Sequence, residues 1–99
     1  MSDSSEISVH REGSDAKGAY VIELPGIERR AELTWVGREG VRHANHTFVP
    51  QEMRGKGIAG KLVDALIADA REQGFRISPD CSYVEASFRR NPDWVDLRA

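Results

Sequence analysis

The sequence has a single cysteine, Cys81, and no long apolar run among its 99 residues. A lone cysteine excludes an internal disulfide, so the composition carries no mark of an oxidising compartment. No apolar run approaches the about 18 residues that a membrane-spanning helix requires. The first residues also lack the basic and apolar regions of a secretion signal. We therefore expect a cytoplasmic protein without a membrane partner.

The chain also has no excess of positive charge, because it contains 14 Lys and Arg residues and 16 Asp and Glu residues. Neutralising nucleic-acid phosphates requires a basic surface, so we expect no nucleic-acid partner. The slightly acidic balance suits a cationic amine substrate. The length allows one small core. We predict a disordered N-terminus over residues 1–5 and a single domain over residues 6–99, favour a monomer, and expect no bound metal.

The first half of the chain alternates apolar and polar residues, with a period of two, between glycine-rich turns. Four segments show this pattern, which is typical of strands. They start near Ile7, run over 19–24 with Tyr20, Ile22 and Leu24 on one face, run over 31–36, and run from Val41 to about Val49. No helical period interrupts them. The pattern predicts an antiparallel meander of about four strands.

The period changes to that of a helix after Gly57. Apolar residues recur at helical spacing, with Lys61, Asp64, Asp69 and Arg71 on the other side, until Gly74; the apolar stripe is Ile58, Leu62, Leu66 and Ala70. A short strand over 75–78 follows, and we expect it to lie parallel to the fourth strand. Residues 81–90 are then predicted as a short helix with Tyr83, Val84 and Phe88 turned inward, and Trp94, Val95 and Leu97 as anchors of the tail. The fold class is therefore α/β, of the α+β kind.

The stretch from Pro50 to Lys61 combines three glycines and three cations at the start of the long helix. Backbone N–H groups at a helix start lack intrahelical partners and carry the positive end of the helix dipole, so they favour phosphate. Three phosphate motifs compete here. They are a P-loop, a dinucleotide-binding G-x-G-x-x-G, and the acyl-CoA turn Arg-x-x-Gly-x-Ala.

The context disfavours the first two motifs. A P-loop needs a hydroxyl residue after its lysine to hold magnesium, and Leu62 occupies that position. A dinucleotide fold needs a strand that runs directly into its first glycine and further parallel strands beyond. This chain opens with a meander, and a polar segment separates the fourth strand from Gly55. The acyl-CoA turn has the required context.

In this respect the sequence resembles the GNAT superfamily of N-acetyltransferases, and within it the very small single-domain members with a Pro-x-Cys-x-Tyr-Val segment. Three segments in order carry the resemblance: residues 46–50 (HTFVP), residues 54–62 (RGKGIAGKL), and residues 79–84 (PDCSYV) with Asn91 and Pro92 beyond. The first half matches only as a pattern of strands.

The resemblance implies a set of cofactor-binding residues for coenzyme A. Arg54 would lie beside the pyrophosphate, whose oxygens the backbone amides of the turn would wrap. The fourth strand would bind the pantetheine arm through its backbone, where it splays from the fifth strand. Gly57 would leave room for the ligand, and Gly60 would allow close helix packing. The residues implied are Phe48, Val49, Arg54, Gly55, Lys56, Gly57, Ile58, Ala59, Phe88, Arg89, Asn91 and Pro92.

Transfer of an acetyl group to an amine needs a proton acceptor for the amine and a proton for the departing thiolate. Cys81 is the first catalytic candidate, either as a nucleophile or as the acid that protonates coenzyme A. His46 is the candidate base, with Glu52 and Glu85 as others. Both Cys81 and His46 also have structural interpretations, as a small buried residue and as a hydrogen-bonded strand residue.

These features predict an acetyl-CoA-dependent N-acetyltransferase whose amine acceptor is a protein lysine, an N-terminus or a small amine. The main alternative is a non-catalytic module that senses coenzyme A or acetyl-CoA. A weaker alternative is a nucleotide-binding or RNA-binding fragment that uses Arg54, Lys56 and Lys61.

Overall fold

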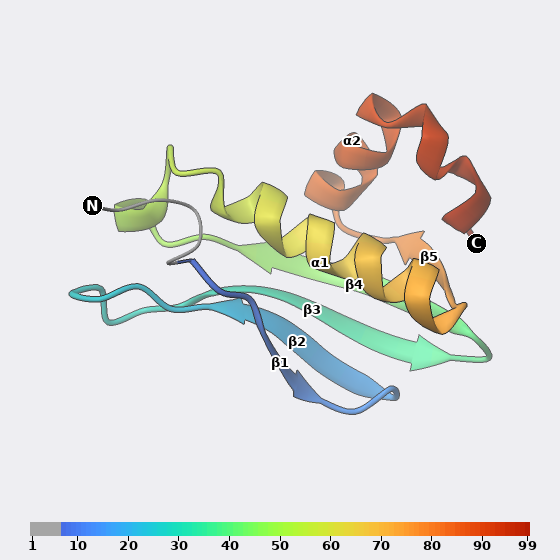
Figure 1. The fold of residues 1–99 in the computed structure, drawn as a ribbon, viewed down its shortest axis with the longest axis horizontal. Coiled ribbons are helices and arrows are strands. Elements are labelled where there is room, and N and C mark those ends of the chain that lie inside the picture. The colour runs from blue at the N-terminus through green and yellow to red at the C-terminus, as the bar shows by residue number, and fades with distance from the viewer. Residues whose placement is uncertain (1–6) are drawn as a thin grey trace.

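The computed structural model describes residues 7–99, which form one five-stranded sheet with its helices on one side (Figure 1). The strands lie in chain order, β1-β2-β3-β4-β5, so each pairs with its neighbour in sequence. The strands are β1 (His10–Gly13), β2 (Lys17–Ile22), β3 (Ala31–Arg38), β4 (Val41–Phe48) and β5 (Arg76–Pro79). The first four are antiparallel and β5 is parallel to β4, as predicted.

Helix α1 (Ile58–Gln73) connects β4 to β5 and packs on β2 and β3, and α2 (Ser82–Arg90) packs on β4 and β5 (Figure 1). Within residues 7–99, two 3-10 helices complete the elements, η2 (Gln51–Met53) before α1 and η3 (Pro92–Leu97) after α2. Within the described residues, no helix covers the opposite face of the sheet.

The core lies between α1 and the sheet. The predicted α1 stripe is buried, since Ile58, Leu62, Leu66 and Ala70 are each at most 2% exposed. It meets the fully buried Ile22 of β2. Burial of the isoleucine and leucine side chains stabilises the fold by about 1.5–3 kcal/mol each. Together these contacts fix α1, and therefore the loop before it, against the sheet.

Several local predictions differ from the structure. The first strand begins at His10 rather than near Ile7, and Gly13 belongs to it. Val95 was expected to anchor the tail, but it is 71% exposed, because Leu97 and Trp94 supply the apolar contacts of η3. Asp69 was assigned to the polar side of α1 but is only 5% exposed, because polar groups of β1 and β2 reach it.

The predicted disordered segment, residues 1–5, lies outside the described residues. In residues 7–99 no helix is both long enough and apolar enough to cross a membrane. The same residues contain no group of three His, Cys, Asp or Glu side chains arranged to hold a metal ion.

Candidate functional site

Met53 anchors the loop between β4 and α1 to the hydrophobic core, where its side chain is fully buried. After Met53 the chain turns outward, and Arg54, Gly55, Lys56 and Gly57 are all exposed. Gly55 has φ +81° and Gly57 has φ +72°, in the left-handed region that side-chain-bearing residues rarely adopt. The glycines at these positions are therefore required by the backbone itself, independently of any ligand.

Helix α1 begins with several backbone N–H groups that have no partner inside the helix. Its first internal hydrogen bond joins the Lys61 N–H to the Gly57 carbonyl at 3.2 Å, so the amides of Ile58, Ala59 and Gly60 precede the ladder. The N-cap is Gly57, which has no side chain to bond them. The helix dipole adds partial positive charge at the same place. This end of α1 has the chemistry of an anion-binding site.

A surface hollow of about 190 Å³ opens at this helix start. A Cβ placed at Gly55, Gly57 or Gly60 would meet no protein atom within 4 Å, so the backbone of the loop borders open space. The hollow is lined by Val49, Met53, Arg54, Gly55, Gly57, Ile58, Ala59, Gly60 and Tyr83. The residues present thus fit a phosphate-bearing ligand such as coenzyme A.

Two of these lining residues, Gly60 and Tyr83, lie in surroundings that the sequence did not predict. Gly60 was expected to allow close helix packing, but nothing lies near the position of its Cβ; it borders the hollow instead. Tyr83 was predicted only as an inward-facing residue of α2. Its position at the hollow depends on how α2 packs beside the loop, and no local pattern in the sequence signals that contact.

A gap opens between β4 and β5 next to this hollow. The parallel ladder covers only Val41 to Ala44 of β4, whereas β4 continues to Phe48. It ends because Pro79 has no N–H, and the next two N–H groups, of Asp80 and Cys81, both donate to the Ala44 carbonyl at 3.0 Å. The edge of β4 beyond Ala44 is therefore left open by β5, which confirms the predicted splay.

Cys81 lies at the closed end of this gap. It is the N-cap residue of α2 and is partly buried, and its Sγ is 3.3 Å from Thr47 Oγ1. Either group can donate in this contact. The thiol is therefore neither sealed in the core nor loose on the surface, and a hydroxyl lies beside it as a hydrogen-bonding partner.

His46 and Cys81 lie on opposite sides of β4. Thr47, which contacts Cys81, pairs with the buried Leu33 on the helix-covered face, whereas His46 pairs with Thr34 on the other face. The structure therefore does not bring the two predicted catalytic side chains together. His46 is exposed. Its ring makes no hydrogen bond within the described part of the chain.

A different histidine on β4 has an ordered partner. His43 Nδ1 lies 3.2 Å from Asp80 Oδ2, and Ser78 Oγ donates to the other oxygen of Asp80 at 2.5 Å. No local pattern in the sequence marks His43, because its partner Asp80 lies 37 residues away on the chain.

The alternative bases are less suitable. Glu85 accepts hydrogen bonds from Arg98 at 2.7 Å and from Arg89 at 3.1 Å. The bond from Arg98 is the main cause that holds the pKa of Glu85 below its usual value, so its carboxylate is a weak proton acceptor. Glu52 is exposed on the surface, 3.8 Å from Arg29.

The four predicted residues near the end of α2 do not line the hollow at the loop. Phe88 is 6% exposed and packs edge-on against Trp94, with ring centroids 5.5 Å apart. Arg89 is bonded to Glu85, and Asn91 donates from its side chain to the Ser87 carbonyl at 2.8 Å. Pro92 begins η3. These contacts join α2 and η3 within the protein itself.

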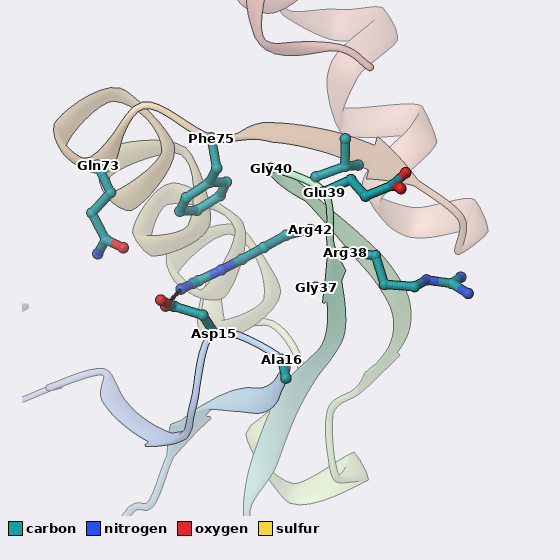
Figure 2. Close-up of a pocket in the computed structure, with 10 residues that line it drawn as sticks. Asp15, Ala16, Gly37, Arg38, Glu39, Gly40, Arg42, Gln73 and Phe75 are labelled. Carbon is teal, nitrogen blue, oxygen red and sulfur yellow. Dashed lines mark hydrogen bonds and ion pairs between the residues drawn. The ribbon is translucent and has the colours of Figure 1, made fainter.

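A larger hollow, of about 390 Å³, lies at the other end of the sheet, by the turn between β3 and β4 (Figure 2). Arg42 extends along it, only 7% exposed, with its guanidinium between the rings of Trp35 and Phe75 at 4.1 and 4.2 Å. Arg42 also donates to Tyr20 at 2.8 Å and to Asp15 at 3.2 Å. Both faces and two donors of the guanidinium are thus used within the protein, which marks Arg42 as a structural residue.

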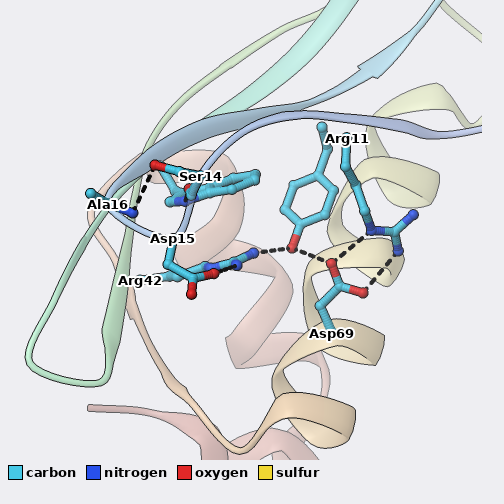
Figure 3. A network of polar contacts seen from close by, with 8 residues as sticks. Arg11, Ser14, Asp15, Ala16, Arg42 and Asp69 are labelled. Atoms are coloured by element: carbon cyan, nitrogen blue, oxygen red, sulfur yellow. Dashed lines mark hydrogen bonds and ion pairs between the residues drawn. The ribbon is translucent and has the colours of Figure 1, made fainter.

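Tyr20 links Arg42 to a second ion pair, between Arg11 and Asp69, on the side of the sheet that α1 covers (Figure 3). Its hydroxyl donates to Asp69 Oδ2 at 2.9 Å and accepts from Arg42, while Arg11 binds both oxygens of Asp69. Burial and the bond to Asp69 raise the pKa of Tyr20, so the hydroxyl keeps its proton as a donor. This network ties β1, β2 and β4 to α1.

Comparison with known proteins identifies the family. A family model described as GCN5-related N-acetyl-transferase matches residues 19–97. Protein NATD1 of Bos taurus is 33% identical over 75 residues, which cover 74% of this chain and 66% of the bovine protein, just under two thirds of its length. Protein NATD1 of Xenopus tropicalis is 30% identical over 87 residues, covering 86% of this chain and 79% of the frog protein. The matched region includes the loop, the gap and both helices, and the chain therefore belongs to the GCN5-related N-acetyltransferase family.

Proposed function

We propose that this protein binds acetyl-CoA through the loop over residues 50–61 and transfers the acetyl group to an amine. Members of its family typically use acetyl-CoA. The observation that carries the proposal is the loop geometry, in which two left-handed glycines lead into a helix start with unpaired amides, directly beside the open edge of β4. Arg54 and Lys56 add positive charge there.

In this proposal, different residues bind different parts of acetyl-CoA. The amides of Ile58 and Ala59, with Arg54, hold the pyrophosphate at the mouth of the gap. The backbone of β4 at Phe48 and Val49 offers hydrogen bonds along its free edge to the pantetheine arm. This orientation directs the thioester along the gap toward the contact between Cys81 and Thr47.

The reaction forms a bond between the amine nitrogen and the carbonyl carbon and breaks the carbon–sulfur bond, whose electron pair stays on sulfur. The amine loses a proton, and the leaving thiolate gains one. In this proposal Cys81 supplies that proton from its thiol and recovers one from solvent. The alternative, in which Cys81 takes the acetyl group first, predicts an acetylated Cys81 when no amine is present.

Calorimetry with acetyl-CoA, coenzyme A, ATP and NAD tests the ligand. We expect binding of the two coenzyme A species and none of the nucleotides. Preferential binding of ATP or NAD would refute the assignment of the loop. Incubation with labelled acetyl-CoA and a mixture of lysine peptides, free N-termini and small amines then tests turnover and the acceptor class.

The main rival function is a sensor that binds acetyl-CoA without turnover. It predicts tight binding with no labelled product for any amine. The partly buried free thiol of Cys81 suits a reducing compartment such as the cytoplasm, where the acetyl-CoA supply for either function is available.

A further inference from the structure

A β-bulge in β4 changes which residues share a face of the sheet. Trp35 of β3 pairs with Ala44, but the next pair joins Thr34 to His46, so Asn45 is an extra residue. Thr34 Oγ1 donates to Asn45 Oδ1 at 2.5 Å and holds the bulge in place. Because Val36 and Thr34 lie on one face of β3, their partners His43 and His46 also share a face. Without the bulge, residues three apart on a strand would point in opposite directions.

The shared face is the one without helices. Trp35 and Ala44, on the other face, are 3% and 0% exposed and belong to the core under α1. His43 and His46 therefore point away from the helices. Within residues 7–99, no helix blocks that approach.

His43 is the ordered member of this pair. Its side chain is 28% exposed and that of Asp80 is 44% exposed, so the pair is reachable from solvent yet fixed by Ser78. With the carboxylate at Nδ1, the neutral ring carries its proton on that nitrogen and donates it to Asp80. The lone pair is then on Nε2. This is the arrangement of a proton acceptor oriented by a carboxylate.

The pair also lies beside the closed end of the gap. His43 immediately precedes Ala44, whose carbonyl receives the N–H groups of Asp80 and Cys81. A ligand that enters at the loop and follows the free edge of β4 runs toward this point, because the β4–β5 ladder stops its progress there. His43, which pairs with Ser78 one step before the ladder ends, and Asp80 thus lie next to the closed end of the gap, on the helix-free face of the sheet.

We propose that His43, oriented by Asp80, accepts the proton of the acceptor amine, and that the amine approaches from the helix-free face. This inference rests on the proposed acetyl transfer and replaces His46 as the base. The N–H bond of the amine breaks as its nitrogen bonds the carbonyl carbon, and the proton moves to His43 Nε2. Asp80 is a positioning residue that stabilises the imidazolium, which returns its proton to solvent. His46 borders the acceptor without taking the proton.

Matched histidine variants test the inference. We expect His43→Ala to lower kcat by about 100-fold or more, in the range that a positioned base contributes, with acetyl-CoA affinity by calorimetry unchanged. His10→Ala, at an exposed site on β1, is the control and keeps the full rate. His46→Ala raises KM for the amine at most a few-fold. Added imidazole restores part of the rate of His43→Ala and leaves that of His46→Ala unchanged.

The carboxylate has its own readout. Asp80→Asn lowers kcat by about tenfold or more without changing the KM for acetyl-CoA, and Asp80→Glu recovers part of the loss. Thermal midpoints identify any variant that does not fold, and His43→Gln then replaces His43→Ala. A full rate in the folded His43 variant, or rescue by imidazole of His46→Ala alone, overturns the assignment of His43. Acetyl-CoA binding without turnover by the unmodified protein instead refutes the proposed transferase function itself.

Discussion

Asp69 of α1 accepts a hydrogen bond from Tyr20 of β2 at 2.9 Å, although 49 residues separate them, and Arg11 of β1 closes the other side of the carboxylate (Figure 3). Because Asp69 is only 5% exposed, its negative charge is stabilised by these partners and not by water. The contact fixes the C-terminal half of α1, the helix that follows the proposed coenzyme A loop.

Asp69→Asn is expected to destabilise the protein by roughly 2–3 kcal/mol, because the hydrogen bonds from Arg11 and Tyr20 lose their charged acceptor and Arg11 loses its counter-charge. Urea unfolding measures the change. Asp64→Asn, on the exposed side of the same helix, is the matched control and shifts the free energy of unfolding by less than about 0.5 kcal/mol. Equal effects of the two substitutions would contradict a buried ionic role for Asp69.

Asp69 also predicts a pH dependence of stability. Burial alone would raise the pKa of Asp69, but the hydrogen bonds from Arg11 and Tyr20 outweigh it and lower the pKa below its usual value. A group with a lowered pKa in the folded state contributes stability above its unfolded value, about 3.9, and loses it as the pH falls through the folded value. The free energy of unfolding should therefore fall below about pH 4, less steeply in Asp69→Asn than in the unmodified protein. A parallel decline in both proteins would exclude Asp69 as the cause.

Gly57→Val is expected to abolish coenzyme A binding. The substitution forces a β-branched residue to φ +72°, which costs about 1–2 kcal/mol, and it fills the space that borders the hollow. Gly74→Val is the control, because Gly74 has φ +83° at the opposite end of α1. Both variants should lose similar stability in thermal unfolding, but only Gly57→Val should lose binding in calorimetry. Retained binding in Gly57→Val would mean that the ligand does not approach this turn.

Arg54→Ala should weaken coenzyme A binding by about tenfold, because an exposed guanidinium beside a pyrophosphate contributes a charge-assisted bond. The loss should shrink as salt rises from 0.05 to about 0.5 M, since solvent screens this contact. Lys61→Ala, at the end of the first turn of α1, should change the affinity by less than about twofold. The reverse order of the two variants would show that the register of the phosphate site is wrong.

Cys81→Ser and Cys81→Ala separate the roles of the thiol. As an acid for the leaving group, Cys81 should be partly replaced by the serine hydroxyl, so that Ser retains more activity than Ala. As a nucleophile, it should give no activity in either variant and an acetyl adduct by mass spectrometry in the unmodified protein without amine. A full rate in Cys81→Ala would leave Cys81 with only its structural contact to Thr47.

The regular parts of the fold were predictable because each has a local period. The α1 stripe from Ile58 to Ala70 repeats with the helix, and the alternation around Leu33 and Trp35 follows the strand, so burial could be assigned from spacing alone. The position of the loop was predictable for a similar reason, since glycine and the change of period both lie at its junction. The resemblance to the family then supplied the ligand, which no period encodes.

The features that escaped prediction all depend on distant partners or on pairing register. Asp69 is a charged residue, and its spacing in the helix predicts an exposed side chain. It is buried because Arg11 and Tyr20 bind its carboxylate. The bulge at Asn45 depends on how β4 pairs with β3, so the shared face of His43 and His46 has no signal in the sequence of β4 itself. Tyr83 reaches the hollow through the packing of α2. Sites built from such contacts need the three-dimensional structure.

The strand order β1-β2-β3-β4-β5 has a consequence for the order of assembly. The first four strands join through short turns, whereas β5 must wait for the 16-residue helix α1 to form and cross the sheet. Local pairings close first because they restrict less of the chain, so the β4–β5 pair is expected to form last and to open first in native-state amide exchange. The two strands that flank the gap, β4 and β5, are therefore the least local strand pair of the sheet. A ligand bound between them would stabilise the last part of the fold to form.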